Sequence, residues 1–224
     1  ILPGFFSEEI QVDNHAVNGR STKSFIDEGR WETVINQVKP GDYVFIQFGH
    51  NDQKEDEARH TDPGSTFDAN LEKFITETIS KGGKPVLFTS IARRHFDEKG
   101  KLIDSHGQYI TATRNVAAKL NIPLIDLNTI THQWVESLGD EASKKYFMWV
   151  EPNTVPAMPA GKKDDTHLNI AGGRAVAALA VQAFKEQLPE LSPYIRQYDF
   201  VVAKDGSGDF FTIQEAIMNV TDDR

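Results

Sequence analysis

The chain has 224 residues, which is room for one sizeable domain, or for one domain and part of another. Hydrophobic residues make up 39% and charged residues 25%, a composition typical of globular proteins, and no apolar run approaches the roughly 20 residues of a transmembrane helix. The formal net charge of −9 argues against broad binding to nucleic acid or anionic membranes, and the absence of cysteine excludes disulfides and thiolate metal ligands.

The first 40 residues are predicted to contain one short strand and two helices. The chain starts at Ile1 without methionine or a signal peptide, so we expect a cut rather than a native N-terminus. A strand is predicted over Ile10–Val12, followed by a polar loop and a helix that Ser21 or Thr22 could cap. The spacing of apolar residues predicts a second helix over Trp31–Val38.

The stretch Tyr43–Asp52, YVFIQFGHND, combines a predicted buried strand with an abrupt polar turn. Its first six residues are rich in aromatic and β-branched side chains, which favours a core strand. In open parallel α/β sheets, ligands bind beyond the carboxyl ends of strands, so the turn at Gly49–Asp52 is a candidate site. Gly, Asn and Asp are also ordinary turn residues, and a plain turn explains the same pattern.

The middle of the chain alternates helices and strands. A polar loop over 53–66 precedes an amphipathic helix predicted at Phe67–Ser80 and a buried strand at Pro85–Ile91. After a charged excursion, a helix is predicted at Tyr109–Leu120 and a fourth strand at Pro123–Leu127. This alternation predicts a doubly wound α/β sandwich with right-handed crossovers.

The C-terminal third is predicted to be helical around an irregular loop. Helices are expected near Thr129–Leu138 and Glu141–Phe147, then a Pro-rich loop over 151–166, then a long helix at Ile170–Gln187. The two prolines of Leu188–Tyr198 indicate a linker.

Three polar blocks follow the predicted strand ends or precede the last helix. They are Asn18-Gly19, Gly49–Asp52 and Asp164–His167. In this order they resemble the SGNH (GDSL-like) hydrolase family, and NHAVNGRSTKSF, FGHNDQK and DDTHLN are similar to its rhamnogalacturonan acetylesterase branch. The resemblance covers about residues 1–187. It implies a flavodoxin-like three-layer α/β/α sandwich and a serine esterase without a cofactor.

The resemblance assigns the base and its carboxylate partner. His167 and Asp164 occupy the positions of the family's catalytic His and of the Asp three residues earlier. In such a triad the His takes the proton of the nucleophile and the carboxylate orients the imidazole. Asp165 is a rival for the orienting role by proximity alone, and a polar residue at a helix N-terminus is the structural alternative for His167.

The same resemblance implies an oxyanion hole from Gly19 and Asn51. The backbone N–H of a glycine allows close approach of substrate, and the Asn amide is a neutral donor for developing negative charge. Gly19 can equally be a turn glycine. We expect Asp52 to hold the loop by local hydrogen bonds rather than to act on substrate.

No nucleophile is assigned. The family's serine lies in a Gly-Asp-Ser block at the end of the first strand, and Ile1–Phe6 resembles the segment just after that block. Ser7, Ser21 and Ser24 do not follow a predicted strand in that context. We therefore expect the first strand to be missing and this chain to be marginally stable and inactive as an esterase, since unpaired buried amides cost on the order of 1–3 kcal/mol each.

The tail carries a second resemblance. Residues 201–217, VVAKDGSGDFFTIQEAI, look like the opening of a pectin methylesterase domain, a right-handed β-helix. This implies an esterase domain over 1–187, a linker over 188–198 and the beginning of a second domain over 199–224. The alternative is a coincidental surface strand and turn.

Acetylated pectin, an acidic polysaccharide, is the substrate that the two resemblances imply. Arg20, Lys23, Arg93 and Arg94 lie in predicted loops after strand ends and could bind its carboxylates, and of these we single out Arg20 and Arg94. Each of them can equally be a solvated surface charge.

Two other functions remain open, a lipase or thioesterase of the same fold and a non-catalytic polysaccharide-binding remnant. The remaining histidines lack zinc-type spacing, so no metal is expected. The substrate implies secretion or a periplasmic location, and the oligomeric state is undetermined.

Overall fold

A computed structural model describes residues 1–196, 201–204 and 208–219. The chain forms two compact units, each built from segments distant in sequence. The sheet unit comprises Asp13–Ala92 and Asp104–His132, and the hairpin unit comprises Ile1–Val12, Arg93–Ile103 and Gln133–Arg224.

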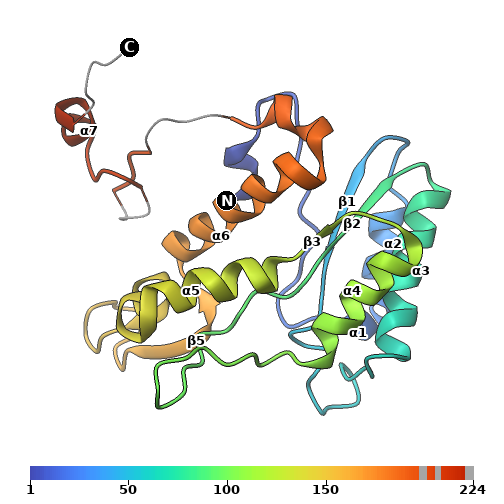
Figure 1. Cartoon of the computed structure of the whole chain (residues 1–224), viewed down its shortest axis with the longest axis horizontal. Coiled ribbons are helices and arrows are strands. Elements are labelled where there is room, and N and C mark those ends of the chain that lie inside the picture. The colour runs from blue at the N-terminus through green and yellow to red at the C-terminus, as the bar shows by residue number, and fades with distance from the viewer. Residues whose placement is uncertain (197–200, 205–207, 220–224) are drawn as a thin grey trace. The chain divides into compact units, whose positions relative to one another are not determined.

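The sheet unit contains a parallel sheet of β1 (Tyr43–Gln47), β2 (Lys84–Phe88) and β3 (Leu124–Ile125), in that order. Tyr43 pairs with Lys84 and Leu87 pairs with Leu124. Helices connect the strands, as expected for parallel pairing. The predicted parallel α/β arrangement is thus confirmed, and the strands lie side by side in Figure 1.

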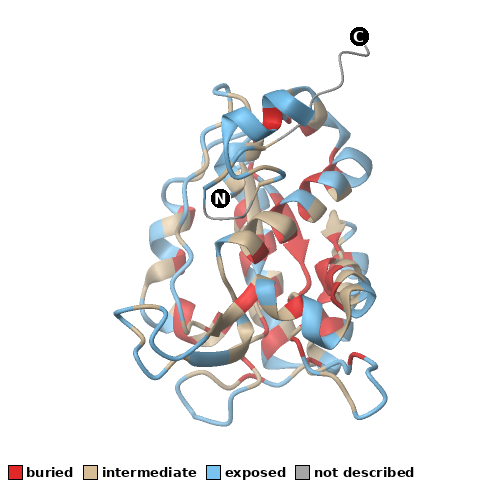
Figure 2. Cartoon of the chain, turned by 90° about the vertical axis from the view of Figure 1, so that its left-hand side faces the viewer, coloured by how far each residue is buried: buried red, intermediate tan, exposed pale blue. Residues whose placement is uncertain are grey.

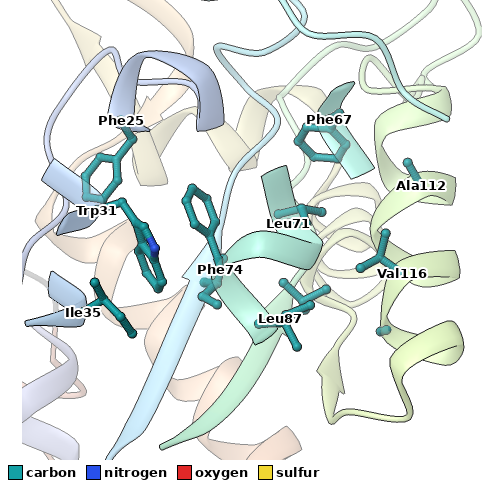
Figure 3. Close-up of a cluster of buried hydrophobic side chains, with 12 residues drawn as sticks. Phe25, Trp31, Ile35, Phe67, Leu71, Phe74, Leu87, Ala112 and Val116 are labelled. Atoms are coloured by element: carbon teal, nitrogen blue, oxygen red, sulfur yellow. The ribbon is translucent and has the colours of Figure 1, made fainter. Parts of the chain in front are cut away.

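Four helices pack with the strands of this sheet around one hydrophobic core (Figure 3). They are α1 (Thr22–Asp27), α2 (Arg30–Ile35), α3 (Thr66–Ser80) and α4 (Gln108–Leu120). Helix α3 is central, because Leu71, Phe74 and Ile75 recur at helical spacing and are at most 1% exposed. Burial of each such side chain contributes about 1.5–3 kcal/mol.

The hairpin unit contains an antiparallel pair, β4 (Phe147–Val150) and β5 (Lys162–Leu168), followed by α6 (Ile170–Gln187). The Asn169 side chain caps α6 by accepting from the Gly172 N–H at 3.0 Å. It also donates to the backbone carbonyls of Lys145 and Phe147 at 2.8 and 3.0 Å, which holds the helix N-terminus against the start of β4.

Helix α5 (Leu127–Ser143) runs from the sheet unit into the hairpin unit and changes direction at Gly139, which has φ 76° and ψ 173°. The remaining elements of the hairpin unit are 3₁₀ helices at Leu2–Phe5, Lys144–Tyr146 and Pro189–Tyr194, and α7 (Ile213–Asn219). One face of α6 is buried, with Val176, Ala180 and Phe184 four residues apart, and Figure 2 colours buried residues red.

One of the predicted elements is wrong and two differ in their bounds. Residues 10–12 form no ladder in the described chain, because an extended segment requires a neighbouring strand for its N–H and C=O groups. The helix predicted at Glu141–Phe147 is present as the end of α5 and the 3₁₀ helix Lys144–Tyr146, and only Phe147 belongs to β4 instead. The strand predicted at Pro123–Leu127 shrinks to two residues, because Pro123 has no N–H and the Asp126 side chain binds Thr89 and Arg114.

The loop predicted over 151–166 is also partly wrong, since its last five residues belong to β5. Their sequence, KKDDT, has little strand propensity, and pairing with the apolar strand β4 is what makes them extended.

The segment predicted as a linker forms a 3₁₀ helix, and Leu191 in it is 5% exposed. Residues 197–198 lie outside the described residues. Beyond them, Val202 bridges Phe210 and α7 follows. The division into domains at this point, and the β-helix character of the tail, stay predictions. Among the described helices, none is long and apolar enough to cross a membrane.

Candidate active site

The motif DDTH lies in an irregularity of the β4–β5 hairpin. Phe147 pairs with Leu168, but the next residue, Met148, pairs with Asp164. Residues 165–167 therefore have no opposing residue and bulge out of the ladder. The bulge removes His167 from the ladder and leaves its side chain 60% exposed.

The carboxylate of Asp164 organises this bulge. Its Oδ1 accepts from the backbone N–H groups of Thr166 and His167, both at 2.9 Å. Its Oδ2 lies 2.8 Å from Nδ1 of His167 and 2.9 Å from Nζ of Lys162. The single carboxylate thus stabilises the turn and holds the imidazole. Nδ1 carries the proton that the carboxylate accepts, and Nε2 is the ring nitrogen that this contact does not use.

The ionisation of Asp164 fits this arrangement. Its side chain is 14% exposed, and burial alone would raise the pKa of the carboxyl. The backbone N–H of His167, the ammonium group of Lys162 and the other donors outweigh burial and hold the pKa well below its usual range. The carboxylate is therefore ionised at neutral pH.

Lys162 was not among the residues predicted for the site. Alternation along a strand places residues two apart on the same face, so the KKDD pattern would have indicated a Lys162–Asp164 pair if this segment had been recognised as a strand.

Asp165, the rival for the orienting role, lies in a different environment. Its Oδ1 accepts from Nε1 of Trp149 at 2.8 Å and lies 2.8 Å from Nε of Arg94. Its backbone carbonyl accepts from the Arg94 N–H at 2.8 Å. The geometry therefore pairs His167 with Asp164 and not with Asp165.

In the sheet unit, the turn after β1 is built around the Asp52 carboxylate, which is fully buried. Its oxygens accept from the Thr22 N–H at 2.9 Å, the Thr61 hydroxyl at 2.9 Å and the Gly49 N–H at 3.1 Å. Burial raises the pKa of this carboxyl and outweighs the hydrogen bonds that lower it. The predicted role of Asp52 in holding the loop agrees with these contacts.

Asp52 brings together the two segments that carry Gly19 and Asn51. Through Thr22 it ties the start of α1 to the turn, and the Asn51 amide donates to the backbone carbonyl of Arg20 at 3.3 Å. Gly19 has φ +77° and open space where a side chain would start. Both predicted oxyanion donors therefore lie at one junction of the sheet unit.

The predicted cationic residues differ in how they are engaged. Arg20 is 33% exposed, and its Nε binds both carboxylate oxygens of Glu28 at 3.0 and 3.1 Å. Lys23 lies in α1 and donates to the Glu57 carbonyl. Arg94 is 5% exposed and pairs with Asp140 and Asp165, which disfavours the predicted contact with substrate.

Two of the serines near the N-terminus have local roles. Ser21 and Ser24 are buried and form a reciprocal capping box at the start of α1. Within the parts of the chain that the structure describes, no group of three or more His, Asp or Glu side chains is arranged to hold a metal ion.

A parallel α/β sheet with a polar turn after its first strand, together with an Asp-x-x-His pair just before the last long helix, defines a hydrolase class. The family model of the GDSL-like Lipase/Acylhydrolase family matches residues 2–175. The chain belongs to this family.

Curated relatives from Bacillus subtilis (strain 168) span most of the chain. Rhamnogalacturonan acetylesterase RhgT is 42% identical over 181 residues, which are 81% of this chain and 77% of the relative. Probable rhamnogalacturonan acetylesterase YesY is 35% identical over 186 residues, 83% of this chain and 81% of the relative.

Solved structures agree on the fold. The crystal structure of YxiM from Bacillus subtilis matches with a TM-score of 0.67 and 28% identity over 83% of this chain, which spans about half (49%) of that chain. An acetylxylan esterase from Geobacillus stearothermophilus, Axe2, matches with a TM-score of 0.52 and 19% identity, over 76% of this chain and 68% of its own. The predicted α/β fold of the SGNH hydrolases is thereby confirmed.

Proposed function

We propose that this protein is a carbohydrate esterase that removes O-acetyl groups from rhamnogalacturonan or related pectin by a serine-hydrolase mechanism. The observation that carries the proposal is the Asp164–His167 pair, with the imidazole held at 2.8 Å and exposed on a bulge. Two relatives that bear the words rhamnogalacturonan acetylesterase, at 42% and 35% identity, support the substrate class.

In this mechanism, Nε2 of His167 removes the proton of a serine hydroxyl as its oxygen attacks the acetyl carbonyl carbon. Asp164 holds the Nδ1 proton and stabilises the imidazolium. The imidazolium then protonates the leaving sugar alkoxide, and water hydrolyses the acetyl-enzyme with His167 again as the base. The Gly19 N–H and the Asn51 amide would stabilise the oxyanion.

The serine itself is not assigned. Ser21 and Ser24 are engaged in the cap of α1, and the prediction that this chain by itself does not turn over ester stays a prediction. Labelling of the full-length gene product with a fluorophosphonate, followed by peptide mapping, would identify the nucleophile. Labelling of Ser21 or Ser24 would contradict the role given to them here.

Acetate release by the full-length gene product tests the proposed activity. We expect turnover of acetylated rhamnogalacturonan and of 4-nitrophenyl acetate, and loss of both in His167→Ala. Turnover confined to long-chain esters or acyl thioesters would favour the lipase or thioesterase alternative. Binding to pectin with no hydrolysis of any ester would favour the non-catalytic alternative.

A polymeric pectic substrate lies outside the cytoplasm, so we propose that the protein is secreted or periplasmic. Fractionation of the producing cells, with the protein detected by antibody, tests this. Recovery only in the cytosolic fraction would contradict it.

A further inference from the structure

Arg94 is a buried cation in the hairpin unit that the proposed mechanism does not use. Its side chain is 5% exposed, its Nη1 binds the carboxylate of Asp140, and its Nε lies 2.8 Å from Oδ1 of Asp165 at an angle too oblique for a hydrogen bond. Its guanidinium lies over the Trp149 ring, 4.8 Å from the ring centre. A buried guanidinium is costly to desolvate, and these partners offset that cost.

Arg94 also supplies a backbone hydrogen-bond donor to the bulge. Because residues 165–167 have no opposing residue in β4, the Asp165 carbonyl has no ladder partner. The backbone N–H of Arg94 donates to that carbonyl at 2.8 Å. Arg94 therefore contacts Asp165 twice, through its backbone N–H at the carbonyl and through its guanidinium at the carboxylate.

Trp149 closes the same cluster from β4. Its indole Nε1–H donates to Oδ1 of Asp165 at 2.8 Å, and Trp149 is the direct cross-strand partner of Lys163. Arg94 and Trp149 thus both contact the Asp165 carboxylate and fix its orientation. Asp165 directly follows Asp164, the residue that holds the imidazole.

We propose that Arg94 is a positioning residue for His167. By holding Asp165 on Trp149, it sets the conformation of the bulge so that Asp164, and not Asp165, holds the imidazole. This inference rests on the proposed function. Without the ion pair, the two adjacent carboxylates can exchange places at Nδ1 and the imidazole loses its single orientation.

The test compares Arg94→Met and Arg94→Lys in the full-length gene product with 4-nitrophenyl acetate as substrate. The Met variant keeps much of the apolar stem but loses the charge, whereas Lys keeps the charge. A misplacement of the reacting groups by about 1 Å can lower rate about 100-fold, so for Arg94→Met we expect a fall in kcat of about 10- to 100-fold, with KM within about twofold. Arg94→Lys should recover part of the loss.

A matched control is Arg114→Met, which removes an arginine–aspartate pair with Asp126 (2.8 Å) in the sheet unit. It should leave kcat within about twofold, because it does not touch the bulge. Thermal unfolding of each variant must show that the folded fraction at the assay temperature is unchanged. Wild-type kcat in Arg94→Met would overturn the inference.

Nitrogen-15 NMR of the histidine side chains supplies a readout that does not require turnover. In the wild type, His167 should show one tautomer with the proton on Nδ1, and in Arg94→Met a mixture of tautomers. An unchanged His167 spectrum in folded Arg94→Met would overturn the inference. If the wild type hydrolyses no ester, the proposed function fails, and this spectrum still decides the role of Arg94.

Discussion

Nδ1 of His167 lies 2.8 Å from Oδ2 of Asp164, although the two residues belong to the same short strand. Side chains three apart on a regular strand point to opposite faces and do not meet. They meet here because residues 165–167 bulge out of the ladder and the Asp164 carboxylate caps the turn that results.

Asp164→Asn and Asp165→Asn distinguish the roles of the two adjacent carboxylates. Asp164→Asn should lower kcat by about 1000-fold, because an amide stabilises neither the Nδ1–H tautomer nor the imidazolium. Asp165→Asn should cost about tenfold or less, since it weakens only the support from Arg94 and Trp149. Initial rates with 4-nitrophenyl acetate provide the comparison, and a larger loss in Asp165→Asn would reverse the assignment.

The lowered pKa of Asp164 implies that the free energy of unfolding depends on pH. The folded state holds its pKa below the usual range, so the ionised carboxylate stabilises the fold above the unfolded value of about 3.9. That stabilisation should be lost as pH falls from about 4 through the folded pKa. Urea unfolding at pH 7 and at pH 3 measures it, and the fall in stability should be smaller in Asp164→Asn than in the wild type.

Asn51→Ala tests the oxyanion donor. Loss of one such donor typically lowers kcat about 100- to 1000-fold, and KM should change little because the interaction strengthens in the transition state. Its hydrogen bond to the Arg20 carbonyl is at 3.3 Å, so the cost in stability should be small. Steady-state kinetics with unfolding midpoints measure both, and a pure KM effect would contradict the assignment.

Arg20→Ala tests recognition of an acidic substrate. Arg20 and Arg30 both bind Glu28 and are similarly exposed, at 33% and 35%, but only Arg20 directly follows Gly19. KM for acetylated rhamnogalacturonan oligosaccharides should therefore rise about two- to fivefold in Arg20→Ala, as for loss of one exposed ion pair worth up to about 1 kcal/mol. Arg30→Ala is the control, and an equal rise for a neutral acetyl ester would show that no carboxylate is recognised.

Gly49→Ala should destabilise the turn after β1. Gly49 has φ +127°, and an added Cβ would lie 2.7 Å from Oγ of Ser90, so backbone strain and overpacking add. We expect a loss of about 2–4 kcal/mol in the free energy of unfolding. Gly100→Ala is the control, because Gly100 has φ +76° but open space, and should cost about 1–2 kcal/mol. Similar losses in both variants would leave no role for the Ser90 contact.

The sequence by itself determined the elements whose signals are local. The helix at Ile170–Gln187 was predicted with its observed bounds, and α3 and α4 to within one residue at their starts, because their apolar periods lie within the elements themselves. The polar turn after Tyr43–Gln47 was likewise recognisable, since the apolar run gives way to Gly49, although the strand predicted to be buried is only partly so, with Ile46 as its one buried residue.

Only the tertiary structure decided the β4–β5 hairpin and the site on it. KKDDTHL is polar, and β4 begins at Phe147 directly after a helical segment, so neither strand is evident without its partner. The spacing of Asp164, Asp165 and His167 left two carboxylates for one imidazole. The choice depends on where a bulge falls and on an arginine some 70 positions away in sequence. Contacts between distant segments, such as the hydrogen bond from the Arg94 N–H to the Asp165 carbonyl, leave no period in the chain.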